Sequence, residues 1–178
     1  MLIGAHVSSS GGIHTAIDRA VAMDADSVQV FTQSPRTWRP TNHDPASFER
    51  FRERREEAGI GAVFCHALYL CNLAAPKDDI YEKSRASMQN TMEVACAIGA
   101  DGVVFHVGSH LGSGFETGLK RVVPALRKAL ERCNESTWQS GSGGFVTRTA
   151  PKPPRRDSAS RRRSKSISTS KTFCMQPT

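Results

Sequence analysis

The sequence has no apolar run near the roughly 18 to 20 residues that a membrane-spanning helix needs. Its first residues also lack a basic segment followed by an apolar stretch and a small-residue cleavage site, so nothing predicts export. From these absences we expect a soluble, cytoplasmic protein that does not engage a membrane. Its 178 residues are too few for an unabridged eight-stranded α/β barrel, which takes about 250 residues.

Cysteine spacings typical of zinc fingers or redox motifs are absent as well. The cysteines are odd in number, which favours reduced thiols in a cytoplasm: Cys65, Cys71, Cys96, Cys133 and Cys174. No glycine-rich dinucleotide fingerprint follows the first predicted strand. A barrel is therefore favoured over a nucleotide-binding doubly wound sheet.

The net charge of +7 is unevenly distributed. Residues 138–178 hold nine Lys and Arg against a single acid, Asp157, whereas residues 1–137 hold 15 bases and 16 acids. The basic balance that would point to nucleic acid thus belongs to the tail. The function of the first 137 residues must be inferred from local motifs instead.

The tail, residues 138–178, is a low-complexity segment rich in Ser, Arg and Pro. It holds too few large apolar residues to offset the entropy of ordering, so we predict that it is disordered. The abrupt change at Trp138 supports a second hypothesis, in which the tail is an out-of-frame translation. Nucleic-acid binding by Arg148 to Lys171 alone is a non-enzymatic alternative function.

Residues 1–137 alternate short apolar runs with longer stretches of helical period, which predicts four strand-then-helix units. Pro124 predicts a kink or an early stop in the last helix. Strands joined by crossover helices pair in parallel, so the expected class is α/β, an incomplete (β/α) TIM barrel of about four units. The expected strands are 2–6, 27–31, 62–66 and 102–106. The first expected helix carries Ile13 to Val21, and the second begins at Pro45 and carries Phe48 and Phe51. The third runs from about 78 to 98, and the fourth lies near 115 to 133.

Three of these strands end in histidine: His6, His66 and His106. One such histidine is more often a hydrogen-bonded, partly buried residue than a ligand. The carboxyl ends of barrel strands share one face, however, so three at equivalent positions favour a functional, metal-binding cluster. His14 and His43 lack that placement and are expected on the surface.

Two of the loops after the strands carry unusual side chains. Arg36 and Arg39 flank Trp38, which is typical of a surface that pairs with phosphate and stacks on bases, or of a loop anchored by a buried indole. Tyr69 and Leu70 follow His66, where apolar side chains either wedge into a base step or pack beneath their own loop.

Four segments in this order resemble endonuclease IV, a zinc-dependent apurinic/apyrimidinic endonuclease of the TIM-barrel class: IGAHVSSSGG, VFTQSPRTWRP, HALYLCNLAAP and FHVGSHLGSG. The resemblance covers about residues 1 to 137, the N-terminal half of such a protein. Leu68 departs from the pattern, because the family has a small residue at this position.

The resemblance implies a DNA repair hydrolase that cleaves the phosphodiester bond 5′ to an abasic site in double-stranded DNA. His66 and His106 match two ligands of a three-zinc cluster, and His6 lines the same site. Arg36, Tyr69 and Leu70 match residues that enter the DNA and hold it bent. Clustered cations would activate a water for in-line displacement.

The remaining ligands of that cluster are missing, since no histidine follows His110 and the only acid after Glu135 is Asp157. Two imidazoles leave zinc under-coordinated, so we expect an inactive chain. An open half barrel is also expected to self-associate. The alternative enzyme class is a metal-dependent sugar-phosphate isomerase or epimerase on a related barrel, although such a site has no use for intercalating groups.

Overall fold

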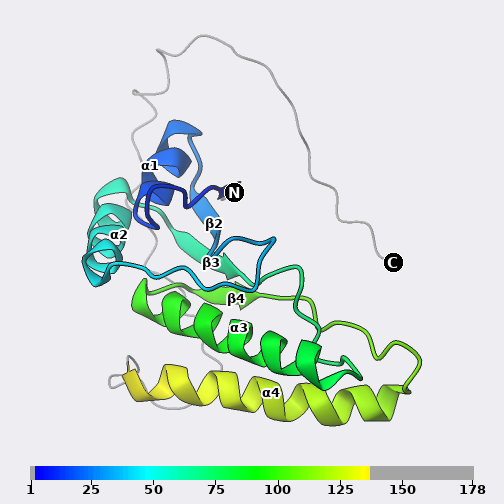
Figure 1. The fold of residues 1–178 in the computed structure, drawn as a ribbon. Coiled ribbons are helices and arrows are strands. Elements are labelled where there is room, and N and C mark those ends of the chain that lie inside the picture. The colour runs from blue at the N-terminus through cyan, green and yellow to red at the C-terminus, as the bar shows by residue number, and fades with distance from the viewer. Residues whose placement is uncertain (1–2, 137–178) are drawn as a thin grey trace.

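A computed structural model describes residues 3–136 and shows four strands alternating with four helices (Figure 1). The tail predictions for residues 138–178 lie outside the described part of the chain. No helix within residues 3–136 is long and apolar enough to cross a membrane. In chain order the elements are β1 (Gly4–Val7), α1 (Thr15–Ala22), β2 (Ser27–Phe31), α2 (Pro45–Ala58), β3 (Ala62–His66), α3 (Asp78–Ala97), β4 (Gly102–Val104) and α4 (Phe115–Ser136).

The strands form one parallel sheet in the order β1-β2-β3-β4, which confirms the α/β class and the partial barrel. Each strand is followed by a helix, as crossover connections between parallel strands require. The predicted elements agree closely with the observed ones. The main differences are that β1 ends at Val7, one residue past His6, and β4 ends at Val104, two residues before His106.

Local capping explains where α2 begins and ends. The carboxylate of Asp44 accepts a hydrogen bond from the backbone N–H of Ala46 at 3.1 Å, and Pro45 occupies the first turn. Gly59 ends the helix in the left-handed region, with φ of 64°, which a residue with a side chain rarely adopts.

The two faces of the sheet differ because side chains alternate along each strand. One face, with Val28, Val30, Val63 and Cys65, is buried beneath α1, α2 and α3. The opposite face would line a closed barrel, and in residues 3–136 no element covers it. Phe64 on β3 and Val104 on β4 are consequently exposed, by 39% and 37%.

The last two helices pack side by side, with α3 against β3 and β4, and α4 mainly against α3 (Figure 1). Helix α4 continues through Pro124, so the predicted early stop is wrong. Its missing backbone hydrogen bond is tolerated because Val122, Ala125 and Ala129 are buried in the cluster shared with α3. Phe115, Leu119 and Leu130 remain exposed on this helix.

Two histidines expected on the surface are half-buried instead. His43 forms a 2.6 Å hydrogen bond between its Nε2 and the carbonyl of Thr32, which ties the segment before α2 to the end of β2. His14 lies at the start of α1, where its Nδ1 is buried. The contact of His43 joins residues 11 apart in the chain, which is why periodicity does not reveal it.

The expectation of reduced cysteines is partly wrong. Cys65 and Cys71 are free and buried, and burial raises the pKa of the Cys65 thiol to about 12. Cys96 is disulfide-bonded. An odd number of cysteines does not exclude a bridge between residues that folding, rather than sequence spacing, brings together.

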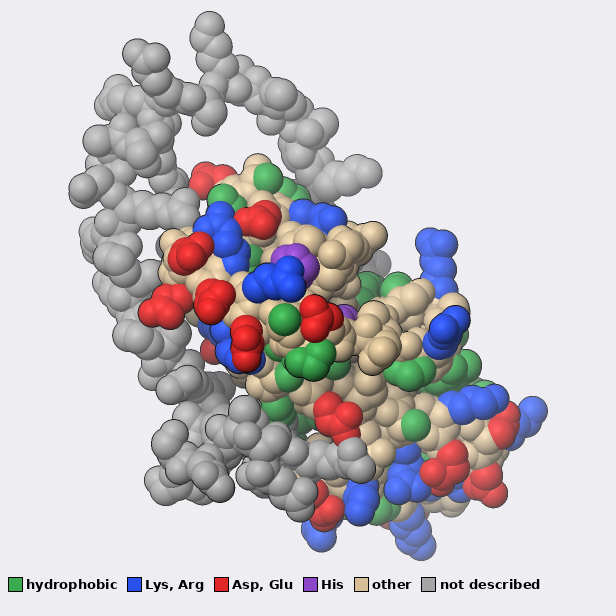
Figure 2. All heavy atoms as spheres, turned by 60° about the vertical axis from the view of Figure 1, so that its left-hand side comes forward, with side chains coloured by type: hydrophobic (Ala, Val, Ile, Leu, Met, Phe, Trp, Pro, Cys, Tyr) green, Lys and Arg blue, Asp and Glu red, His purple; other side chains and the backbone are tan. Residues whose placement is uncertain are grey.

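Acidic and basic side chains are interspersed on the face shown in Figure 2. One ion pair of the structure is partly buried: Arg55 Nη2 lies 2.6 Å from Asp101 Oδ2, with side-chain exposures of 18% and 16%. The same carboxylate oxygen accepts the backbone N–H of Val63 at 2.8 Å. Asp101 therefore joins α2, β3 and the turn before β4.

We expect Asp101→Asn to lower the free energy of unfolding by about 2 kcal/mol, because it weakens charge-assisted hydrogen bonds in a partly buried position. Urea denaturation would measure the change. Glu131→Gln is the matched control, since Glu131 forms only an exposed pair with Lys128 at 3.8 Å and should change stability by less than about 0.5 kcal/mol. Equal midpoints for both variants would contradict the role of Asp101.

Candidate metal and nucleic-acid site

His66 is the most enclosed of the candidate site residues. It is the last residue of β3 and is 7% exposed. Its Nδ1 lies 2.6 Å from the backbone carbonyl oxygen of Ala67, so this nitrogen donates and Nε2 is the atom available for a ligand. A backbone carbonyl commonly orients metal-binding histidines in this way.

The other two histidines lie beside it. The ring centroids of His66 and His106 are 5.6 Å apart, and those of His66 and His6 are 6.1 Å apart. Both outer residues are exposed, whereas His66 lies between them. The structure thus brings together the three histidines singled out from the sequence, at the carboxyl edge of the parallel sheet.

His6 is held by the neighbouring strand. Its Nδ1 lies 2.9 Å from the Nε2 of Gln29, its register partner on β2. Burial lowers the pKa of His6, and the nearby charge of His66 lowers it further. His6 therefore favours the neutral imidazole more than a solvated histidine does.

An aromatic residue missed by the sequence analysis completes this cluster. Phe31 ends β2 directly opposite His66 in the strand register. Its ring centroid is 4.6 Å from His6, 5.1 Å from His66 and 5.3 Å from Tyr69. The sequence feature that could have revealed Phe31 is its position at the end of a predicted strand, equivalent to the positions of the three histidines.

Tyr69 and Leu70 project from the loop after β3. Tyr69 is 59% exposed, yet its ring lies 5.1 Å from that of His66 and 5.9 Å from that of His106. Leu70 is 40% exposed. Leu68, the departure from the family pattern, is buried beneath the same loop, so its larger side chain fills the interior.

Asn72 joins this loop to the one that follows His106. Its Nδ2 donates to the carbonyl of Ser109 at 2.9 Å, and its Oδ1 accepts the backbone N–H of Ser109 at 3.0 Å. The backbone of Gly108 passes so close that an added Cβ would lie 2.0 Å from this oxygen, and its φ is 96°. Only glycine fits there.

Arg36 lies on a different loop, between β2 and α2. Within residues 3–136 its side chain is exposed and has no hydrogen bond or ion pair in the structure. Arg39 is exposed too, while Trp38 between them is half-buried. The half-buried indole agrees with an anchored loop, and the exposure of both arginines is compatible with either interpretation of this segment.

The described side chains do not fit a complete zinc site. Residues 3–136 contain no group of three or more His, Cys, Asp or Glu arranged to hold a metal ion. His66 and His106 offer two imidazoles, whereas stable zinc sites use three or four protein ligands. The assignment of these two residues as zinc ligands stays a prediction.

A parallel sheet whose crossover helices cover one face, with a side-chain cluster at its carboxyl edge, is typical of a (β/α) barrel protein. Residues 17–139 match the family described as xylose isomerase-like TIM barrel, and the chain belongs to it.

Within that family the chain is similar to endonuclease IV, which confirms the resemblance found in the sequence. It is 38% identical over 136 residues to the probable endonuclease 4 of Citrifermentans bemidjiense, covering 76% of this chain and 48% of that protein. Endonuclease IV from Thermus thermophilus superimposes with a TM-score of 0.65 at 36% identity, over 72% of this chain and 47% of that one. The chain spans about half the length of the curated relatives it matches.

A D-psicose 3-epimerase structure superimposes with a TM-score of 0.54 at 12% identity, covering 76% of this chain and 49% of that one. This likeness shows the fold alone.

We expect zinc to bind the chain only weakly, because residues 3–136 contain no group of three or more His, Cys, Asp or Glu arranged to hold a metal ion. Isothermal titration with zinc alone would measure it, comparing the unaltered chain with His66→Asn, His106→Asn and the control His14→Asn. Tight stoichiometric binding that is lost in the first two variants and kept in the third would contradict this expectation.

Proposed function

We propose that this chain belongs to a DNA repair endonuclease that acts on double-stranded DNA at abasic sites, cleaving the phosphodiester bond on the 5′ side. The observation that carries the proposal is the position of Tyr69, an exposed aromatic side chain packed against the histidine cluster. A ring beside a metal-binding edge suits a protein that must open a base stack next to its reaction centre.

Three side chains form the proposed DNA-contacting surface. Tyr69 and Leu70 present apolar surface that would replace a missing base in the stack. Arg36, which has no partner among the described residues, would pair with backbone phosphate. An abasic site is the preferred target because no base has to be unpaired there.

The proposed zinc cofactor calls for donors beyond those that the described residues hold. His66 and His106 would supply two imidazole ligands, and His6 would line the same edge without binding metal. Because this set is incomplete, we derive no hydrolytic step from it. We expect the chain by itself to bind abasic DNA without nicking it.

The two rival functions predict different surfaces. A sugar-phosphate isomerase or epimerase encloses a small substrate and gains nothing from an exposed Tyr69 and Leu70. Binding through the basic tail alone would ignore abasic sites and would weaken steeply with salt. We further propose that the chain acts in the cytoplasm, where the DNA that it would repair lies.

We expect the chain to bind a duplex containing a tetrahydrofuran abasic analogue more tightly than the intact duplex of the same sequence. Tyr69→Ala and Leu70→Ala should each reduce this preference about tenfold, because an apolar contact within the stack is lost. Fluorescence anisotropy at several salt concentrations would measure both affinities.

The matched control is Leu130→Ala, which removes an exposed leucine on α4 that lies 24 residues after His106. It should leave the preference for the abasic duplex unchanged. Equal affinity of the unaltered chain for both duplexes would refute the proposed function, and nicking of the abasic strand would refute our expectation that the chain is inactive.

We also propose that the open face of the sheet makes the chain self-associate. Strands β1 and β4 are the edges of the described sheet, and Phe64 and Val104 are exposed on the face that a closed barrel would bury. Unpaired edges and exposed apolar surface both favour association between chains.

Sedimentation velocity should therefore show a concentration-dependent dimer or larger species. Val104→Lys should shift the distribution toward monomer, since a charge on an edge strand opposes pairing. Val123→Lys is the matched control, because Val123 is similarly exposed but lies on helix α4. A monomer at all concentrations would contradict self-association.

A further inference from the structure

Helix α3 carries buried polar residues where an amphipathic helix would bury apolar ones. Ser84, Ser87 and Thr91 are 0%, 5% and 0% exposed. Their spacing places them on one face of the helix. Buried hydroxyl groups need partners. On this face Ser84 and Thr91 donate to carbonyls of α3 itself, and they also accept hydrogen bonds from the two loops that carry the proposed DNA contacts.

The loop with Tyr69 and Leu70 is tied to the first part of this face. The backbone N–H of Asn72 donates to the Oγ of Ser84 at 2.8 Å. Cys71 is buried, and its thiol pKa is raised by burial and lowered to a smaller extent by the neighbouring Ser87. Tyr69 and Leu70 thus lie immediately before a buried residue, Cys71, and a residue that α3 holds by a hydrogen bond, Asn72.

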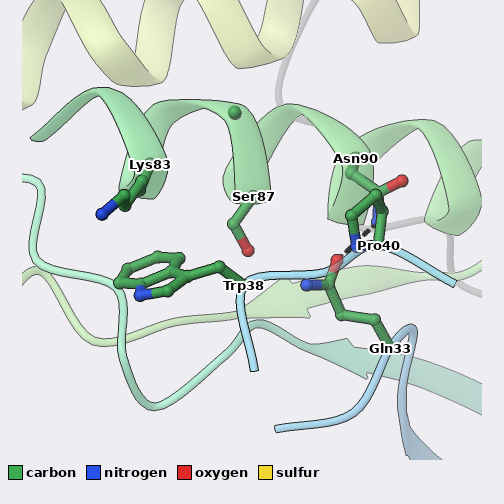
Figure 3. A pocket seen from close by; sticks show the side chains of 7 residues that line it. Gln33, Trp38, Pro40, Lys83, Ser87 and Asn90 are labelled. Carbon is green, nitrogen blue, oxygen red and sulfur yellow. Dashed lines mark hydrogen bonds between the residues drawn. The ribbon is translucent and has the colours of Figure 1, made fainter. Parts of the chain in front are cut away.

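The loop with Arg36 is tied to the second part of the same face. The Oγ1 of Thr32 donates to the Oγ1 of Thr91 at 3.4 Å. The Oε1 of Gln33 accepts a hydrogen bond from the Nδ2 of Asn90 at 2.7 Å, shown as a dashed line in Figure 3. These contacts fix the beginning of the loop but not its tip.

Trp38 supplies the second attachment of this loop. Its indole lies along α3 and lines a pocket of about 180 Å³ (Figure 3). Residues 36, 37 and 39 around it are exposed, whereas Trp38 is half-buried, so the indole is the most enclosed side chain of this stretch. The other lining residues are Gln33, Pro40, Lys83, Ala86, Ser87 and Asn90.

We infer that α3 is the common support that sets the spacing between Arg36 and the Tyr69–Leu70 pair, and that Trp38 is a positioning residue for Arg36. This inference rests on the proposed function. Arg36 is held between Gln33 and Trp38, so the loop reaches DNA already restricted in conformation. Such restriction improves affinity by reducing the entropy lost on binding.

A double-mutant cycle tests this role. Arg36→Ala should weaken binding to the tetrahydrofuran duplex about tenfold, because the proposed contact with phosphate is lost. Trp38→Ala should weaken it by a similar factor, because Arg36 would then lose more conformational entropy on binding. The double variant should bind no more weakly than Arg36→Ala alone, since Trp38 acts through Arg36. Trp38→Phe should restore most of the affinity, because a smaller ring still packs against α3.

Two controls separate positioning from loss of fold. Thermal midpoints of all variants should stay close to that of the unaltered chain, and Glu82→Gln, an exposed change on α3, should not alter DNA binding. Additive losses in the cycle, or failure of Trp38→Phe to recover affinity, would overturn the positioning role.

A spectroscopic measurement tests the anchor without DNA. In a Trp138→Phe background, Trp38 fluorescence should be partly protected from acrylamide, and Ala86→Phe, which puts a ring into the pocket, should raise quenching. If Trp38 in the Trp138→Phe variant is quenched as strongly as free indole, Trp38 does not anchor the loop. If the anchor holds but the chain does not distinguish abasic DNA, the proposed function fails and the positioning role fails with it.

Discussion

Parallel pairing of the four strands is the constraint on which the candidate site depends. Because the strands run in one direction and each is followed by a helix, their carboxyl ends meet at one edge. Side chains far apart in the sequence therefore lie close together. The ring centroid of His66 is 6.1 Å from that of His6 and 5.6 Å from that of His106. The helices pack on the other face of the sheet and keep this edge open.

Much of this arrangement could be predicted from the sequence, because apolar runs and caps are local signals. The bounds of β2 and β3 and the capping of α2 by Asp44 and Gly59 follow from such signals. The contact of His43 with Thr32, the disulfide at Cys96 and the place of Phe31 in the ring cluster could not. These features arise from packing between segments distant along the chain.

The polar face of α3 shows why a hydrophobic pattern alone is incomplete evidence. Ser84 and Thr91 occupy positions that a periodicity analysis assigns to solvent or to a weak helix, yet both are fully enclosed. Each hydroxyl donates to a carbonyl of α3 and accepts a hydrogen bond from a neighbouring loop, Ser84 from Asn72 and Thr91 from Thr32. Helix α3 therefore supports the two loops beside the candidate site as well as covering the sheet.

The carboxamide of Asn72 bridges the segments that follow β3 and β4 through two hydrogen bonds to Ser109, and it leaves no room for a side chain at position 108. The backbone N–H of Leu73 also donates to the carbonyl of Val107 at 3.1 Å, so the two segments are joined by main chain as well as by this amide. The loop that presents Tyr69 is therefore anchored to the same backbone that carries His106.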